Sequence, residues 1–318
     1  MTLKRRSIAA VAALALASPA LPVRAQQQKV RVLLDWFVNP DHAALIVARQ
    51  NGIFAKYGLD VELIAPADPN APPKLVAAGQ AEYAISYQPT LQMLVAEGLP
   101  LVRVGVLVAQ PLNSLVALES GPIRTIADFK GRKIGYSIAG FDEAILGAML
   151  DSAGLSLKDV TLININFALT KALMTKQVDG VIGAFRNFEL NDLEINNARG
   201  RIWLVEQHGV PMYDELVLVE KRETHDAART RRLLAALAEA TAWLKANPEP
   251  AWKIFEAYAK ELANELNRRA WKDTVPLLAD DPYALDDARY AGFGQFLVKR
   301  GLLKMPPDPA TYLRRIAR

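Results

Sequence analysis

No cysteine occurs anywhere in the 318 residues of this sequence. Its absence excludes disulfide bonds, thiolate nucleophiles and sulfur-ligated metals. Histidine is scarce as well: His42, His208 and His225 are far apart, and none has a histidine or glutamate partner at metal-ligand spacing. The Gly-x-Ser-x-Gly pattern of a hydrolase nucleophile is also missing. We therefore expect no catalytic residue, no bound metal and no cofactor.

The apolar run near the N-terminus is too short to span a membrane. Ile8–Ala17 contains ten residues without a charge, about half of the ~20 that a transmembrane helix needs. A basic segment, Lys4–Arg6, precedes the run, and Val23-Arg24-Ala25 follows with small or apolar residues at the −3 and −1 positions. This three-part layout predicts a secretory signal peptide over residues 1–25. The general and the twin-arginine export routes both stay open.

An excess of one charge is missing once this segment is set aside. Residues 1–25 carry four basic side chains and no acidic ones, which accounts for the whole net charge of +4. A neutral protein has no basic surplus for binding nucleic acid, so we expect no nucleic-acid partner. We also expect the protein to be a monomer. An exported chain without disulfides favours a bacterial periplasm over a eukaryotic secretory route.

The first part of the remaining chain alternates between strand and helix patterns. Lys29–Trp36 is a β-rich apolar run, and His42–Gly58 has helical spacing and a closing glycine. Leu59–Ala65 alternates as a second strand, and Pro72–Tyr87 contains a short helix followed by a third strand. This order predicts a parallel α/β unit.

The same order of elements recurs further along the chain, in Arg132–Ser137, Phe141–Gly154, Asp159–Asn166 and Thr170–Phe185. The recurrence predicts two related lobes, with one continuous sheet as the alternative. Matching residues lie 97 positions apart, as in Lys74 with Lys171, Gln80 with Gln177, Glu82 with Asp179, and Ile85 with Ile182.

Two extended segments connect the predicted lobes. Leu112–Gly121 precedes the second unit and Tyr213–Glu223 follows it, while the chain from about Asp226 has mainly helical spacing. A lobe interrupted by an inserted lobe is the architecture of a hinged binding protein. We therefore predict an α/β, type II periplasmic-binding-protein fold with the ligand in the cleft between two lobes joined by two crossover strands. The expected division is residues 29–115 plus 218–318 for lobe 1 and residues 116–217 for lobe 2.

Ligands of parallel α/β sheets bind beyond the carboxyl ends of the strands. Here those ends carry aromatic, amide and carboxylate side chains, a combination suited to a flat, polar heterocycle. Phe37 is the exception, because it follows Trp36 on the opposite pleat and is expected in the core. The predicted ligand-binding residues are Trp36, Asn39, His42, Tyr87, Phe185, Asn187, Phe188 and Glu189, with Tyr136, Arg186 and Tyr213 as further candidates.

A small anion is the alternative ligand. The Gly135–Gly140 loop precedes a helix start, which can bind anions through backbone N–H groups. Asp142 and Glu143 lie in the first turn of that helix, however, where they cap it and repel an anion. Arg186 could still pair with an anion from the other side, so an alkanesulfonate, nitrate or taurine ligand stays open.

Four stretches of this sequence resemble a known family. "LDWFVNPDHAALIVARQNGIFAKYGLDVEL", "GQAEYAIS", "IADFKGRKIGYS" and "AFRNFE" are similar to the periplasmic substrate-binding proteins related to thiamine-pyrimidine synthase, the SsuA/NMT1-like family. The resemblance covers nearly the whole chain after the signal peptide. It implies a receptor that delivers a small molecule to an ABC permease in the inner membrane. The implied ligand is a hydroxymethyl- or formylaminomethyl-aminopyrimidine precursor of thiamine, with riboflavin as the ligand of a related branch.

The resemblance also implies roles for single residues. Trp36 and Asn39 match the family residues that contact the pyrimidine, and Glu189 can accept from an exocyclic amino group. Arg186 replaces a tryptophan of the family motif, so one stacking face is missing. The synthase branch has a cysteine-rich run, a lysine that binds the cofactor and a histidine that serves as substrate. This chain has no cysteine, and Ser86 and Thr90 stand at the positions that align with the lysine and the histidine. The resemblance therefore favours a binding protein over a pyrimidine synthase.

Overall fold

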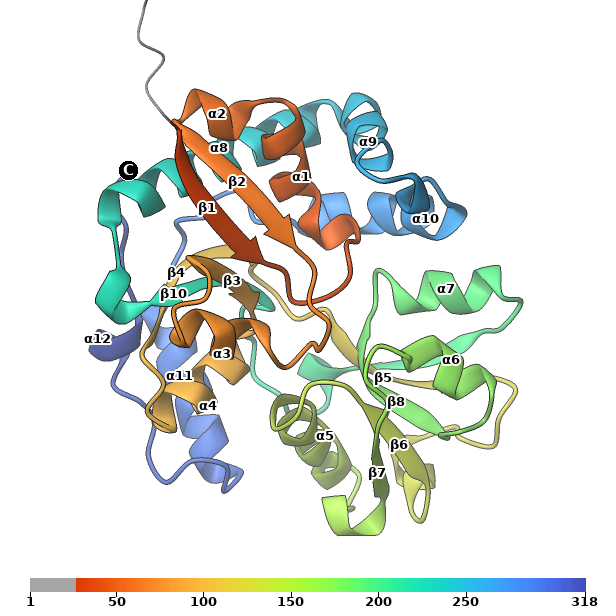
Figure 1. The fold of residues 1–318 in the computed structure, drawn as a ribbon. Helices are drawn as coiled ribbons and strands as arrows, with labels where there is room; N and C mark the ends of the chain where they lie inside the picture. Colours follow the sequence, from red (N-terminus) through yellow and green to blue (C-terminus); the bar gives the residue numbers. More distant parts are fainter. Residues whose placement is uncertain (1–26) are drawn as a thin grey trace, which may run out of the picture.

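The computed structural model describes residues 27–318, which form two lobes, each built on a five-stranded sheet (Figure 1). The strand order is β2-β1-β3-β10-β4 in the first sheet and β7-β6-β8-β5-β9 in the second. The alternative of one continuous sheet is therefore wrong. The predicted signal peptide lies outside the described residues. The strands are β1 Gln28–Leu33, β2 Leu59–Ile64, β3 Tyr83–Ser86, β4 Leu101–Val108, β5 Asn113–Leu118, β6 Lys133–Tyr136, β7 Thr161–Asn164, β8 Gly180–Phe185, β9 Gly200–Leu204 and β10 Leu216–Lys221.

The two sheets have the same topology. In the first, β1 pairs in parallel with β2 and β3, and β10 lies antiparallel between β3 and β4. In the second, β6 pairs in parallel with β7 and β8, and β5 lies antiparallel between β8 and β9. The 97-residue offset holds in three dimensions, since α3 (Pro72–Ala77) and α6 (Leu169–Met174) are equivalent helices at that spacing. The lobes therefore share one strand–helix plan.

The exchange between the sheets lies a few residues away from the expected division. β5 enters the second sheet at Asn113, which pairs with Phe185, so residues 113–115 belong with lobe 2. β10 enters the first sheet at Leu216, so residues 216–217 belong with lobe 1. Alternation along an extended segment does not reveal which sheet provides its hydrogen bonds. We propose that the lobes join through residues 109–112 and 205–215.

The two joining segments are bonded to each other by Glu215. One carboxylate oxygen, Oε2, accepts hydrogen bonds from the backbone N–H groups of Leu112 and Asn113, at 2.6 and 2.9 Å. The same oxygen accepts from the Tyr213 hydroxyl at 2.9 Å. The outgoing and returning chains are thus held together at one point.

The helices cover the sheets and form much of the first lobe. The C-terminal helices pack on this lobe, with α8 and α9 against α1, α11 against α4 and α12 against β4. β4 is buried along its whole length because this covering leaves neither face in water. No helix within residues 27–318 combines the length and apolar character needed to cross a membrane. The remaining helices are α1 Ala43–Gln50, α2 Ile53–Lys56, α4 Gln88–Ala96, α5 Phe141–Ser152, α7 Glu189–Ile195, α8 Ala227–Ala246, α9 Pro248–Glu256, α10 Glu265–Thr274, α11 Asp287–Lys299 and α12 Pro309–Tyr312.

Candidate ligand-binding site

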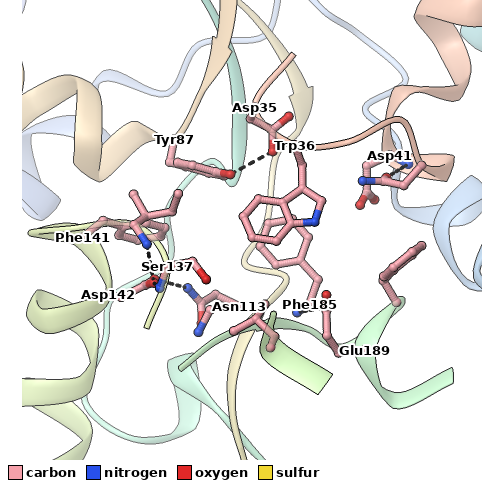
Figure 2. A pocket seen from close by; sticks show the side chains of 15 residues that line it. Asp35, Trp36, Asp41, Tyr87, Asn113, Ser137, Phe141, Asp142, Phe185 and Glu189 are labelled. Atoms are coloured by element: carbon pink, nitrogen blue, oxygen red, sulfur yellow. Dashed lines mark hydrogen bonds between the residues drawn. The ribbon is translucent and has the colours of Figure 1, made fainter. Parts of the chain in front are cut away.

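A pocket lies between the lobes, beyond the carboxyl ends of β1, β3, β6 and β8 (Figure 2). This is the position at which open α/β sheets bind ligands. The first lobe contributes Asp35, Trp36, Asn39, Asp41 and Tyr87, and the second contributes Asn113, Ser137, Ile138, Phe141, Asp142, Leu169, Gly183, Phe185, Phe188 and Glu189.

Aromatic side chains bring the two lobes into contact around this pocket. Trp36 meets Phe167 of the second lobe edge-on, with ring centroids 4.5 Å apart. Tyr87 stacks on Phe141 at 5.3 Å and lies edge-on to Phe185 at 6.5 Å. Such pairs contribute roughly 0.5–1.5 kcal/mol each beyond the area they bury. The structure therefore represents a closed arrangement of the lobes.

The prediction that Phe37 lies in the core is wrong. Its side chain is 41% exposed and lies 5.8 Å from the Phe188 ring across the lobe boundary. The strand β1 ends at Leu33, so the pleat no longer alternates at positions 36 and 37. Both aromatics are consequently directed toward the second lobe.

Asn39 and His42 hold the turn that follows β1. The Asn39 Oδ1 accepts from the Asp41 backbone N–H at 2.8 Å, which caps the 3₁₀ turn Pro40–His42. The buried His42 does not line the pocket. Its Nδ1 accepts from the Asn39 backbone N–H at 3.3 Å, which leaves a hydrogen on Nε2 to donate to Asp35 at 2.9 Å. His42 thus positions Asp35 rather than lining the cleft.

Asp35 connects the turn to the third strand. Its Oδ2 accepts from the Tyr87 hydroxyl at 2.8 Å, drawn as a dashed line in Figure 2. Burial, with the negative charge of Asp35, raises the pKa of Tyr87 well above its ordinary value. Tyr87 therefore stays a neutral hydrogen-bond donor.

Four carboxyl groups line the pocket, and no lysine, arginine or histidine does so among the described lining residues. Burial raises the pKa of Glu189 to about 8, and the charge of Asp41 adds to this effect. Burial likewise raises the pKa values of Asp41 and Asp142 to about 7. A pocket of this kind offers hydrogen-bond acceptors and, on the protonated carboxyl groups, donors, and its described lining provides no positive charge for an anion.

Asp41 and Glu189 come from opposite lobes and lie near enough for the charge of Asp41 to raise the pKa of Glu189. Asp41 has a buried oxygen, Oδ2, without a partner in the protein. Glu189 begins α7, and its Oε2 accepts from the Phe185 backbone N–H at 2.7 Å. A buried acceptor without a partner is unfavourable, so the Asp41 oxygen is a natural contact for a ligand donor.

Asn187 does not line the pocket but connects the lobes. Its Nδ2 donates to Asp41 Oδ1 at 2.8 Å and to Thr274 Oγ1 at 2.7 Å. Thr274 ends α10, which belongs to the first lobe. We refer to Asn187, Asp41 and Thr274 as the Asn187 latch.

Arg186 faces the hinge instead of the cleft. Its two terminal nitrogens pair with Glu206 at 2.7 and 2.8 Å. The same guanidinium donates to the backbone carbonyls of Leu112 and Asn113, both at 3.3 Å. A guanidinium with these partners is neutralised inside the protein and is not directed toward a bound anion.

The two remaining candidates also lie outside the lining. Tyr213 is fully buried, donates to Glu215, and packs edge-on behind Phe141 at 5.8 Å. Tyr136, the last residue of β6, is half-buried and is not among the lining residues. Of the eleven residues predicted from the sequence, those lining the pocket are Trp36, Asn39, Tyr87, Phe185, Phe188 and Glu189.

Several lining residues were missed by the sequence reasoning, including Asp41 and Asn113. Asp142 was interpreted as a helix cap, and it does accept from the backbone N–H groups of Ser137 and Ile138 at 2.9 and 2.8 Å. It also lines the pocket, because Gly183 lacks a side chain where the carboxylate approaches. A Cβ at Gly183 would lie 3.0 Å from an Asp142 oxygen, and its φ of +97° favours glycine. Gly183, a glycine near the end of a predicted strand, was the feature of the sequence that could have indicated the position of Asp142.

Comparison with solved structures shows that this chain has the fold of the periplasmic binding proteins. The alkanesulfonate-binding protein SsuA of Xanthomonas axonopodis pv. citri, solved with MOPS, superimposes with a TM-score of 0.73 over 91% of this chain and 100% of that chain. The sequences are 16% identical, so this likeness concerns the fold alone. The predicted fold class is confirmed.

The chain belongs to the NMT1/THI5-like family, whose model matches residues 39–251. A Haemophilus influenzae protein named as a thiamine biosynthesis protein is 51% identical over 278 residues, covering 87% of this chain and 88% of the relative. The formylaminopyrimidine-binding protein of Halalkalibacterium halodurans is 31% identical over 257 residues, covering 80% and 77%. The family resemblance seen in the sequence motifs is confirmed. In the part of the chain that the structure describes, no group of three His, Cys, Asp or Glu side chains could hold a metal ion.

Proposed function

We propose that this protein is the periplasmic solute-binding component of an ABC importer and that its ligand is an aminopyrimidine precursor of thiamine. The observation that carries the proposal is the composition of the cleft. Aromatic side chains surround four carboxyl groups, and no basic side chain is among the described lining residues. The names of the relatives from Haemophilus influenzae and Halalkalibacterium halodurans support the same ligand class.

An aminopyrimidine has the features that this cleft requires. Its flat ring fits among aromatic side chains such as Trp36 and Phe185, and its exocyclic amino group donates hydrogen bonds to carboxylates such as Glu189. A protonated carboxyl can in turn donate to a ring nitrogen, and the raised pKa of Glu189 provides that form near neutral pH. The Glu189 carboxyl can then accept from the amino group of the ligand and donate to the neighbouring ring nitrogen.

Binding across the cleft favours the closed arrangement. A ligand that contacts Asp41 on one lobe and Glu189 on the other binds the closed form more tightly than the open form. We propose that the closed, loaded protein is the form that docks on the permease and that no chemical conversion of the ligand takes place.

A sulfonate-type ligand is disfavoured by the same observations. The pocket has no basic lining residue among the described residues, and Arg186 is paired with Glu206. A bound sulfonate would lie beside Asp41, Asp142 and Glu189 without a compensating charge. Riboflavin is a larger flat heterocycle, and calorimetry with both ligands distinguishes it from the pyrimidines.

Native mass spectrometry of the protein purified from its host, followed by calorimetry, tests the proposal. We expect one molecule of 4-amino-5-hydroxymethyl-2-methylpyrimidine or its formylaminomethyl counterpart per chain, with the ligand recovered unchanged. Riboflavin and an alkanesulfonate serve as comparison ligands under the same conditions. Tight binding of the sulfonate with no binding of either pyrimidine would refute the proposal.

A further inference from the structure

A second cavity adjoins the ligand pocket at Tyr87. The two cavities share Asp35, Tyr87 and Ile138 as lining residues. Asp35 and Tyr87, which are hydrogen-bonded to each other, therefore border both cavities. We refer to this second space as the rear cavity.

Two hydroxyl groups of the rear cavity lack a partner in the protein. Ser86, at the end of β3, is only 1% exposed, and its Oγ makes no hydrogen bond. The buried Oγ1 of Thr90, in the first turn of α4, makes none either. Other buried hydroxyls are paired, since Ser114 Oγ donates to the Ala184 carbonyl at 2.6 Å and Thr230 Oγ1 bonds the Tyr83 hydroxyl at 2.7 Å. Buried polar groups normally have partners, so the two unpaired hydroxyls indicate a site for one.

The rear cavity carries fewer carboxyl groups than the ligand pocket and has one basic side chain. Asp35 is shared by both cavities, Lys74 and Glu97 are exposed side chains of opposite charge on the rear lining, and Met93 and Ile85 provide apolar surface. Hydroxyl groups can both donate and accept hydrogen bonds. The chemistry therefore suits a neutral group that itself donates and accepts, such as a hydroxyl or an amide.

We propose that the rear cavity is a subsite for the substituent of the heterocycle held in the ligand pocket. The substituent is a short neutral chain with a hydroxyl or amide group, which bonds Ser86 and Thr90. This inference rests on the proposed function, because it assigns the ring to the pocket lined by Trp36 and Glu189. It adds that recognition has two parts, an acidic aromatic site for the ring and a neutral hydroxyl-lined site for its side chain.

The rear cavity also lies at a contact between the lobes. Asn70, on the first lobe, accepts from the Ala139 backbone N–H at 2.9 Å and donates to the Ser137 carbonyl at 3.0 Å. Asn70 and Ala139 both line the rear cavity. A substituent bound here lies next to residues of both lobes and so contributes to closure as well as to recognition.

Calorimetry with matched ligands and variants tests the subsite. The ligands are 4-amino-5-hydroxymethyl-2-methylpyrimidine, its formylaminomethyl counterpart, and 4-amino-2,5-dimethylpyrimidine, which has the ring without a polar substituent. The variants are Ser86→Ala and Thr90→Val. Ser152→Ala is the control, because that hydroxyl bonds the Met149 carbonyl outside both cavities. Melting temperatures establish that each variant is folded.

We expect each variant to weaken binding of the two polar-substituted ligands by about two- to tenfold, the range for one hydrogen bond. Binding of the dimethyl compound should stay the same in both variants, and the control should match the unmodified protein for all three ligands. Equal changes for all ligands, or no change for any, would mean that the rear cavity holds only water and would overturn the subsite while leaving the proposed function intact. Failure of the unmodified protein to bind any of the pyrimidines would overturn both.

Discussion

Replacing Asn187 by alanine should weaken ligand binding although Asn187 does not line the pocket. The substitution removes two bonds between the lobes, to Asp41 at 2.8 Å and to Thr274 at 2.7 Å. A net value of about 1 kcal/mol for the neutral bond and 1.5–2 kcal/mol for the bond to the carboxylate gives a loss of roughly 2.5–3 kcal/mol from the closed form. If the open form is preferred without ligand, this loss raises Kd by roughly 70- to 160-fold.

Calorimetry with the hydroxymethyl pyrimidine measures the change in Kd, and small-angle X-ray scattering reports whether the unliganded variant is more open. Asn196→Ala is the matched control. Its amide makes two bonds as well, to the backbone and side chain of Asp192 at 2.8 and 3.1 Å, but both lie within the second lobe. An equal loss of affinity in the two variants, or no loss in Asn187→Ala, would refute the latch.

Three further predictions concern the pocket and the hinge. Trp36→Ala should raise Kd by about tenfold or more, since buried aromatic anchors carry much of a binding energy. The variant should stay folded with a lowered melting temperature, because it loses the contact with Phe167; calorimetry and thermal denaturation measure the two effects. Because the pKa of Glu189 is about 8 in the folded protein against an ordinary 4.5, its carboxyl is protonated only in the folded state across this window. Stability should therefore fall as the pH rises from about 5 to 8, and Glu189→Gln should flatten the melting-temperature profile; an unchanged slope would contradict the assignment. Arg186→Gln should lower the melting temperature by a few degrees, because Glu206 and the hinge carbonyls lose their donor, and should leave selectivity between pyrimidine and sulfonate unchanged; sulfonate binding that depends on Arg186 would contradict this.

The general position of the pocket could be predicted from the sequence. Parallel strands end at the same edge of a sheet, so Trp36 after β1 and Phe185 at the end of β8 were expected to meet across a cleft. The repeat at a 97-residue spacing supplied the second lobe. Neither inference required knowledge of side-chain contacts, because both depend on element order alone.

The direction of single side chains could not be predicted in the same way. Asn187 and Glu189 lie two residues apart, yet Glu189 lines the pocket while Asn187 bonds Thr274, 87 residues further along the chain. Phe37 follows the end of a strand, where alternation no longer applies. The partner of Arg186 is Glu206 on another element. Such outcomes depend on how distant segments pack, and local patterns carry no information about it.

The two joining segments have a consequence for how selectivity and affinity can be changed separately. Ser114 in the first strand of the second sheet pairs with Leu204 in its last strand, and Glu215 bonds the two joining segments next to this pair. We expect a substitution there, such as Glu215→Gln, to act on the balance between open and closed forms, and every ligand must bind against that same balance. Affinities for all ligands should then change by one common factor, and their ratios should not. Changes in ratio require substitutions in the ligand pocket or the rear cavity.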